Sequence, residues 1–247
     1  MKILGIIPAR LASTRFPAKA LADIKGKSMV QRVYEQTSAA KKLDKVVVAT
    51  DHEDIRKHVE SFGGEVVMTS EAHPSGTDRC REALDQQDTD YDYVVNIQGD
   101  EPFIAPETID ELVALLDGKT QLATLVNQVK EAPLLFNPTI MKVMFNKNME
   151  AIYFSRECVP YLRGVDKSEW LQHHTYYKHV CIYAYRADIL REVTELQVSS
   201  LEKAESLEQL RWLENGYPIK IGITEHESIS IDTPEDLERA LDIMGLN

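Results

Sequence analysis

Short, continuous apolar runs recur along the first half of the chain and alternate with segments that have the apolar spacing of helices. The runs are Ile3–Ile7, Val46–Ala49, Glu65–Met68, Tyr93–Ile97 and Leu122–Val126, and the helical segments are Met29–Ser38, Glu53–Phe62 and Pro106–Leu116. Such runs are typical of strands that are buried on both faces of a parallel sheet. The alternation therefore predicts an α/β fold with a mainly parallel mixed sheet flanked by helices.

The alternation stops after residue 127. Strand-like segments follow at Thr139–Phe145, Ala151–Phe154 and Val180–Tyr185, without helices of useful length between them. We expect a small antiparallel excursion here, over about residues 128–190, with a long surface loop at Arg163–Tyr177.

Regular structure is predicted again near the end of the chain. Ser199 and Glu202 have the spacing of a capping box and open a helix that runs to about Asn215. The remaining predicted elements are strands at Ile219–Ile223 and Ser228–Ile231, and a last helix with Thr233 as N-cap, Pro234 as its first residue and Asp236 as the reciprocal acid.

Composition narrows the class of protein. A chain of 247 residues with 43% hydrophobic residues and no visible linker is predicted to form a single domain, residues 1–247. A net charge of −12 removes the usual driving force for nonspecific nucleic-acid binding. The three cysteines are far apart, and no apolar run is long enough for a signal-peptide core or a membrane span. We therefore expect a cytoplasmic protein that binds neither nucleic acid nor membranes.

Two common nucleotide-binding motifs are not present. Gly26-Lys27-Ser28 ends like a phosphate-binding P-loop, but Leu21 stands where that motif requires its first glycine. A dinucleotide-binding motif needs three spaced glycines after the first strand, where this chain has Pro8-Ala9-Arg10. An anionic ligand must therefore be bound by a local cluster of cations.

Such a cluster follows the first strand. Arg10, Arg15 and Lys19 lie within ten residues that contain no acidic side chain. Open α/β sheets bind ligands at the carboxyl ends of their strands, and Arg and Lys both suit phosphate groups. The alternative is that these are solvated surface charges, but the lack of a local acid favours a polyanion site.

Two acidic residues are predicted to lie at the same edge of the sheet. Asp100 follows the strand Tyr93–Ile97, and Asp232 lies between a strand and a helix start. Two carboxylates beside a triphosphate-sized cationic loop would suit Mg²⁺, which takes one or two carboxylates and completes its shell with phosphate and water. For Asp232, a simple helix-initiation turn is an equal alternative on local evidence.

Three further groups of polar residues have two interpretations each. The segment Ser75–Arg79 is either a helix N-terminus that faces a ligand or only a helix cap. His179 and Tyr183 share one face of a strand, where such residues more often belong to a core or an interface. Glu208 and Gln209 fall at surface positions of a predicted helix by their spacing alone.

Taken in order, several segments resemble the 3-deoxy-manno-octulosonate (Kdo) cytidylyltransferases, also called CMP-Kdo synthetases. The resemblance runs almost from end to end, through Ile6–Arg10, Ala12–Arg15, Val48–Asp51, Ser75–Arg79, Asn96–Pro102, Tyr153–Arg156, Leu207–Arg211 and Asp232–Leu237. One segment departs from the family, which usually reads Pro-Gly-Lys-Pro-Leu where this chain has Pro17-Ala18-Lys19-Ala20-Leu21. Lys19 is retained, but the glycine near the phosphates is replaced by Ala18.

The resemblance implies a Rossmann-like nucleotidyltransferase fold with a small antiparallel dimerisation subdomain, and a homodimer. It implies the reaction of CTP with Kdo, with Mg²⁺, to give CMP-Kdo and pyrophosphate for lipopolysaccharide biosynthesis. By the same resemblance, the triphosphate is bound by Arg10, Ser13, Arg15 and Lys19, and the cytidine lies near Ser75, Thr77 and Arg79. Mg²⁺ is expected to be held by Asp100 and Asp232, and catalysis to depend on Lys19, Arg10 and Asp100. The residues expected to contact the sugar are Gln98, Arg156, His179, Tyr183, Glu208 and Gln209.

Two other functions stay open on the sequence. A cytidylyltransferase for another sugar acid, such as 8-amino-Kdo or sialic acid, would keep the same groups for the triphosphate. A noncatalytic nucleotide-binding protein on the same fold is the alternative of another class, because fold alone does not determine function. The presence of both Asp100 and Asp232 argues against the noncatalytic alternative.

Overall fold

The computed structural model describes residues 1–13, 15–227 and 229–245. Nine strands of this part form one sheet, in the order β11-β7-β10-β6-β1-β4-β5, with β8 and β9 attached beside β10. Neighbouring strands of the path are parallel, except that β10 runs antiparallel to both β6 and β7. The predicted mainly parallel mixed sheet is confirmed. The strands are β1 (Ile3–Ala9), β4 (Lys45–Thr50), β5 (Val66–Met68), β6 (Tyr93–Asn96), β7 (Leu122–Gln128), β8 (Lys142–Phe145), β9 (Ala151–Ser155), β10 (Tyr177–Arg186) and β11 (Ile219–Ile223).

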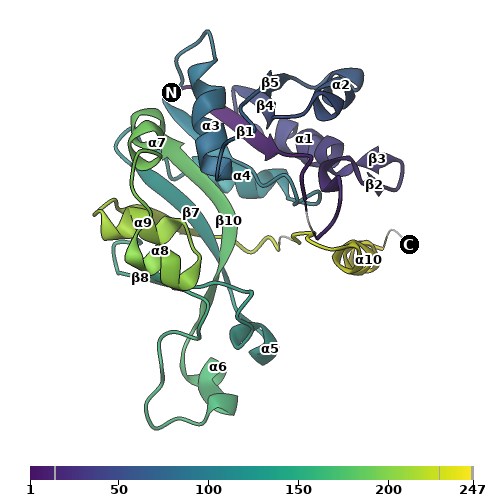
Figure 1. The fold of residues 1–247 in the computed structure, drawn as a ribbon. Helices are drawn as coiled ribbons and strands as arrows, with labels where there is room; N and C mark the ends of the chain where they lie inside the picture. Colours follow the sequence, from purple (N-terminus) through teal and green to yellow (C-terminus); the bar gives the residue numbers. More distant parts are fainter. Residues whose placement is uncertain (14, 228, 246–247) are drawn as a thin grey trace.

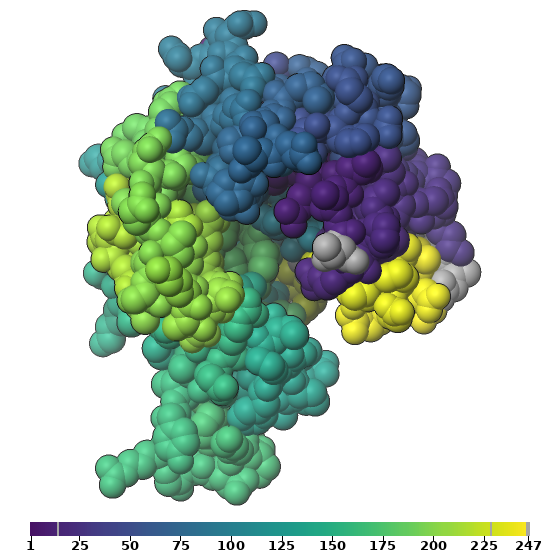
Figure 2. All heavy atoms as spheres, in the orientation of Figure 1, coloured from purple at the N-terminus to yellow at the C-terminus, as the bar shows by residue number. Residues whose placement is uncertain are grey.

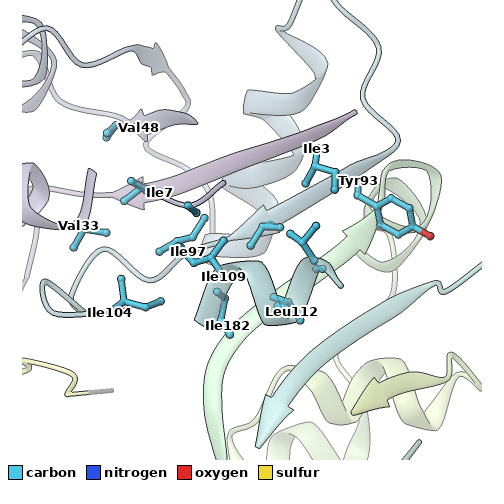
Figure 3. Packing of buried hydrophobic residues seen from close by; sticks show 14 of the residues in the cluster. Ile3, Ile7, Val33, Val48, Tyr93, Ile97, Ile104, Ile109, Leu112 and Ile182 are labelled. Carbon is cyan, nitrogen blue, oxygen red and sulfur yellow. The ribbon is translucent and has the colours of Figure 1, made fainter. Parts of the chain in front are cut away.

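Helices cover both faces of the sheet (Figure 1). On β1, Ile3 and Ile7 pack into one apolar cluster and Leu4 and Ile6 into the other, so the run is buried from both sides as predicted. Figure 3 shows the first cluster, in which side chains from β1, β4, β6, α1 and α4 meet. The first cluster lies under α1 (Met29–Ser38), α2 (Glu53–Ser61) and α4 (Pro106–Val113), and the second under α3 (Gly76–Asp85), α7 (Ala187–Val193) and α9 (Gln209–Glu214).

The last helix, α10 (Pro234–Ile243), lies beside the segment that follows β1 (Figure 1). It packs through Ala240 against a hairpin of β2 (Asp23–Ile24) and β3 (Lys27–Ser28), which the sequence did not predict. Thr233 caps α10 in a capping box with Asp236, as predicted. This packing brings the start of α10 close to the cationic loop although they are more than two hundred residues apart in sequence.

The antiparallel strands β8 and β9 are present, but the predicted surface loop at 163–177 is only partly correct. It contains a 3-10 turn at Lys167–Glu169 and α6 (Trp170–His173). Trp170 and Tyr176 are 2% and 1% exposed, because they pack with α5 (Ala132–Leu135) into a small cluster of their own. In Figure 1, α5 and α6 lie in an arm away from the main sheet.

The single helix predicted from Ser199 to Asn215 is wrong, because the structure has two. The helix α8 (Ser200–Glu205) begins with the predicted capping box and ends at Ser206, where φ is 54°. Arg156 donates to the carbonyl oxygens of Glu205 and Ser206, at 2.7 and 3.3 Å, and so satisfies acceptors that a continuous helix would use. Contacts from a distant strand end therefore separate α8 from α9.

Two other expectations concern the end of the chain and the membrane. Residues 229–231 form no strand, and Ser228 of the predicted strand lies outside the described residues. In the part of the chain that the structure describes, no helix has both the length and the apolar character needed to cross a bilayer.

Lys142 on β8 is a fully buried cation that contacts carbonyl groups. Its Nζ donates to the backbone oxygens of Asn137 (3.0 Å), Ile140 (2.7 Å) and Arg156 (2.5 Å). Burial lowers the pKa of Lys142, which measures the cost of removing the ammonium from water. The side chain therefore joins β8, the segment before it and the end of β9.

We expect Lys142→Met to lower the free energy of unfolding by about 2–4 kcal/mol in urea denaturation. Three partly buried carbonyl groups lose their donor, and relief of the desolvation cost of the ammonium offsets only part of that loss. Lys147→Met, at an exposed position of the turn between β8 and β9, is the matched control and should change stability by less than about 0.5 kcal/mol. Equal stability of the Lys142 variant and the wild type would contradict this role.

Candidate functional site

A pocket of about 300 Å³ lies at the carboxyl ends of β1 and β6. Figure 2 shows the surface hollowed between the purple N-terminal segment, the blue segment and the green segment that carries α8. The pocket brings together the cationic loop, the acid that follows β6 and the acid that precedes α10. Its lining includes Arg10, Ser13, Arg15, Lys19, His73, Ser75, Arg79, Gln98, Asp100 and Asp232.

A glycine permits the close approach of two strand ends. A Cβ atom at Gly99 would lie 2.7 Å from the carbonyl oxygen of Pro8, closer than real Cβ contacts allow. The loop after β6 can therefore lie directly against the end of β1. The backbone oxygen of Asp100 also accepts a hydrogen bond from the N–H of Ile231, at 2.9 Å, which fixes the segment that carries Asp232.

The predicted cations and acids pair with one another. Lys19 Nζ lies 2.8 Å from Asp100 Oδ2 and 3.1 Å from Asp232 Oδ1. Arg15 donates to both carboxylate oxygens of Asp232, each at 3.1 Å. The helix-initiation role belongs to Asp236, which accepts from the N–H groups of Asp232 and Thr233. The carboxylate of Asp232 is thus free of the helix start and belongs to the ion cluster.

The two carboxylates fit a magnesium ion. Both contact the same ammonium nitrogen, so a single cation at that place can reach both. Among the described residues, no group of three or more His, Cys, Asp and Glu side chains is arranged to hold a metal. Mg²⁺ needs six oxygen ligands, and this site would have to draw the rest from phosphate and water. Two carboxylates could therefore hold Mg²⁺ only together with oxygen ligands from outside the chain.

Ala18, at the position where the family usually has glycine, has a left-handed backbone conformation. Its φ and ψ are 52° and 33°, in the left-handed region that favours glycine. The turn is closed by a hydrogen bond from Leu21 N–H to the Ala18 carbonyl, at 2.8 Å. The alanine therefore keeps the turn that places Lys19, at a backbone cost of about 1–2 kcal/mol.

The segment Ser75–Arg79 forms the start of α3, and its residues differ in what they face. Ser75 caps the helix by accepting from Asp78 N–H, and it lines the pocket. Arg79 also lines the pocket, but its guanidinium pairs with Asp51 at 2.7 Å. The buried hydroxyl of Thr77 donates to Glu208 at 2.6 Å and is not part of the pocket lining.

Glu208 and Gln209 are not at the surface positions that their spacing predicted. Gln209 is 5% exposed. The Glu208 carboxylate is held by Thr77 and by Ser75, whose Oγ lies 3.0 Å from Oε1. Burial raises the pKa of Glu208, and the two hydroxyl contacts oppose that rise. The expectation failed because the break at Ser206 turns α9 toward α3.

His179 and Tyr183 share one face of β10, as predicted, with ring centroids 5.0 Å apart. The hydroxyl of Thr124 donates to a backbone oxygen at 2.6 Å and lies 2.8 Å from His179 Nε2, so it accepts the Nε2 proton. Burial lowers the pKa of His179 to about 3, and the ring is neutral at physiological pH. Within the described residues, His179 Nδ1 and the Tyr183 hydroxyl have no hydrogen-bond partner.

The six residues predicted to contact the sugar do not line one pocket. Gln98 lines the pocket with the ion cluster, whereas Arg156 contacts carbonyls at the end of α8. The other four lie on β10 and at the start of α9, where Tyr183 packs edge-on against Trp212. His179 lines a second pocket of about 180 Å³, together with Glu101, Asn127 and Met141, so the six residues are divided among separate parts of the structure.

Sequence reasoning missed three residues near the pocket. His73 lines it, Glu82 contacts His73, and Asp51 holds Arg79. Asp51 follows β4 as Asp100 follows β6, so the strand-end argument could have found it. No local signal identifies His73 or Glu82, because their contact depends on how the loop before α3 folds back.

Comparisons with known proteins agree with this geometry. The family model described as Cytidylyltransferase matches residues 4–229. The chain is 59% identical over 246 residues to the 3-deoxy-manno-octulosonate cytidylyltransferase of Parabacteroides distasonis, with 98% of this chain and 97% of that protein covered. A solved CMP:2-keto-3-deoxy-manno-octonic acid synthetase complexed with CTP superimposes with a TM-score of 0.92 at 38% identity, over 99% of both chains.

The fold itself is shared more widely. The 4-diphosphocytidyl-2C-methyl-D-erythritol synthase from Anaerococcus prevotii has a TM-score of 0.64 at 13% identity, over 99% of this chain and 98% of that one, which shows a common fold alone. The match of nearly the whole chain at 59% identity identifies the family, which a shared fold at 13% identity does not. The chain therefore belongs to the 3-deoxy-manno-octulosonate cytidylyltransferase family.

Proposed function

We propose that this chain transfers CMP from CTP to the anomeric hydroxyl of Kdo and releases pyrophosphate. The observation that carries the proposal is the ion cluster, in which Lys19 lies between Asp100 and Asp232 at the carboxyl ends of the strands. Relatives of high identity are named for this activity, and a structural relative of 38% identity was solved with CTP.

The triphosphate would replace the carboxylates as the partner of the cations. Arg10 and Arg15 suit phosphate oxygens because a guanidinium donates two parallel hydrogen bonds. Lys19 supplies a point charge from a side chain that is 17% exposed, in a position where solvent screening is reduced. The chain thus provides three cationic side chains to bind the highly charged triphosphate.

The reaction itself needs positioning and charge stabilisation. The anomeric oxygen of the sugar attacks the α-phosphorus in line, a new O–P bond forms, the bond to pyrophosphate breaks, and the hydroxyl proton passes to solvent. Negative charge grows on the leaving pyrophosphate, where Arg15 and Lys19 stabilise it. No covalent intermediate with the protein is required.

We infer that Asp100 and Asp232 hold Mg²⁺ once Lys19 has turned toward the phosphates. A bound Mg²⁺ would neutralise charge on the phosphate oxygens. The contact of both aspartate carboxylates with the Lys19 ammonium supports this assignment.

For the sugar, we infer that a cation and neutral hydrogen-bonding groups act together. The Kdo carboxylate suits the guanidinium of Arg156. His179 Nδ1 and the Tyr183 hydroxyl, which have no partner in the described part of the chain, suit sugar hydroxyls. We also assign Gln98 and Gln209 to the sugar, whereas Glu208, which contacts Ser75 and Thr77, is assigned to the nucleotide through those two hydroxyls.

We further infer that the antiparallel strands and the arm pair two copies of the chain in a homodimer. Ile152 on β9 and Tyr161 in the arm are 56% and 70% exposed, and apolar side chains this exposed are suited to a subunit contact. The three cysteines are unpaired, which supports the expected cytoplasmic location.

Purified chain should release pyrophosphate only when CTP, Kdo and Mg²⁺ are all present. The four nucleoside triphosphates are each assayed with Kdo, 8-amino-Kdo and sialic acid, because the same triphosphate groups would serve any of these acceptors. Faster turnover with another acid would reassign the acceptor. Binding of CTP without turnover of any acceptor would favour the noncatalytic alternative.

Asp100→Asn and Asp232→Asn should each raise the Mg²⁺ concentration needed for half-maximal rate about ten-fold or more, at saturating CTP and Kdo. The amide keeps the shape of the side chain but removes the charge that attracts Mg²⁺. Glu235→Gln, at an exposed acid beside the site, is the matched control. A variant with a wild-type Mg²⁺ titration would remove that aspartate from the metal site.

Glu208→Gln should raise the Kd for CTP about three- to ten-fold, because the carboxylate contacts hydroxyls at the start of α3. Thr77→Val should have a similar effect, and the double variant should be weaker by less than the sum of the two single effects, since both changes weaken the Thr77–Glu208 contact. Calorimetric titration with CTP measures all three. Unchanged CTP affinity with a raised Kdo KM would instead make Glu208 a direct sugar ligand.

A further inference from the structure

The guanidinium of Arg156, which follows β9, is held by main-chain carbonyl groups. It donates to the carbonyl oxygens of Glu205 (2.7 Å), Ser206 (3.3 Å) and Pro138 (3.3 Å). In the described part of the chain, none of its hydrogen-bond partners is a carboxylate. Carbonyl groups orient a guanidinium but carry no net charge, so the positive charge and the remaining N–H groups stay available to an anion.

The charge of Arg156 acts on the same part of β10 as the acids of the ion cluster. Burial raises the pKa of the Cys181 thiol, which lies on β10. Three acids, Glu101, Asp100 and Asp232, raise this pKa further, and the charge of Arg156 lowers it. The thiol is therefore within electrostatic range of both groups, which places the guanidinium near the ion cluster.

Glu205, the last residue of α8, also holds Arg156 through its side chain. The carboxylate accepts from the main-chain N–H of Arg156 at 2.9 Å and from the hydroxyl of Ser155 at 2.7 Å. Lys142 donates to the carbonyl oxygen of Arg156 at 2.5 Å. Both main-chain polar groups of this arginine therefore have charged partners, while its own charged group has none among the described residues.

We infer that Glu205 is a positioning residue for the anionic acceptor, because it holds Arg156 in the orientation that binds the sugar carboxylate without pairing with its charge. An acid paired with the guanidinium would compete with the sugar, whereas an acid bonded to the main-chain N–H does not. A guanidinium donates two parallel hydrogen bonds to a carboxylate only when its plane is correctly oriented. The inference rests on the proposed function, and within it on the assignment of Arg156 to the Kdo carboxylate.

Two glutamines separate this role from general support of α8. Glu205→Gln keeps the size of the side chain but replaces one acceptor oxygen by an amide nitrogen, which cannot accept. Glu214→Gln is the matched control, because Glu214 accepts from a hydroxyl and a main-chain N–H at the opposite end of α8. Rates of pyrophosphate release at saturating CTP and Mg²⁺ give the KM for Kdo and kcat, and calorimetry gives the Kd of CTP.

Glu205→Gln should raise the KM for Kdo about three- to ten-fold and leave kcat and the Kd of CTP within about two-fold of wild type. Glu214→Gln should leave all three quantities unchanged. Arg156→Lys should itself raise the KM for Kdo, and Glu205→Gln should have a smaller effect in that background, since an ammonium lacks the planar fork that Glu205 orients. Ser155→Ala removes one donor to the Glu205 carboxylate and should raise the KM about two-fold.

A wild-type KM in Glu205→Gln, an equal loss of CTP affinity, or an undiminished effect in the Arg156→Lys background would overturn the inference and leave the proposed reaction intact. If Glu205→Gln does not fold, Ser155→Ala decides, and an unchanged KM in that variant would overturn the inference. An unchanged KM in Arg156→Lys would overturn the assignment of Arg156 and the inference with it. A wild type that does not turn over Kdo would overturn both the proposed function and the inference.

Discussion

The contact of Lys19 with Asp100 and Asp232 holds together the parts of the chain from which the site is built. It joins the loop after β1, the loop after β6 and the segment before α10. In the absence of ligand these charges neutralise one another, so the site can be organised without leaving like charges together. The pair of Arg15 with Asp232 is exposed, and such pairs contribute only about 0–1 kcal/mol, so a triphosphate could take the place of that carboxylate at small cost. Ligand binding is then an exchange of partners within a site that already exists.

At the start of α3 and in the loop before it, acidic side chains fix the positions of their neighbours by hydrogen bonds and ion pairs. Asp51 holds Arg79, Glu82 holds His73, and Glu208 holds the first turn of α3. These carboxylates come from the end of β4, from α3 itself and from the start of α9. They serve as fixed hydrogen-bond acceptors and position side chains that the nucleotide would meet, which is what a preorganised site requires.

The strand β10 connects two of the residues proposed to bind the sugar, His179 and Tyr183, with the arm. It begins beside the arm and continues between β6 and β7, where it is the one strand of the central path that runs antiparallel to its neighbours. His179 and Tyr183 lie within it, on the face that packs against α9. The groups proposed to bind the sugar are therefore part of the core, and their positions depend on core packing more than on loop conformation.

Local sequence determined the features that depend on neighbouring residues alone. These include the alternation of buried strands and amphipathic helices, the capping boxes at Ser199 and Thr233, and the cationic and acidic loops at strand ends. Periodicity, capping and strand-end position are properties of a few adjacent residues, and the motifs that they form also carried the family resemblance.

Tertiary structure alone decided how those features are used. Arg156 interrupts a helix whose local pattern was continuous, and the resulting turn brings Glu208, which helical spacing places at the surface, into contact with Ser75 and Thr77. The pairing of Lys19 with both aspartates and the contact of His73 with Glu82 follow from the packing of loops. The physical reason is the same in each case. The partners that neutralise a side chain's charge and form its hydrogen bonds are the groups that the whole fold brings near it. Those groups are distant in sequence.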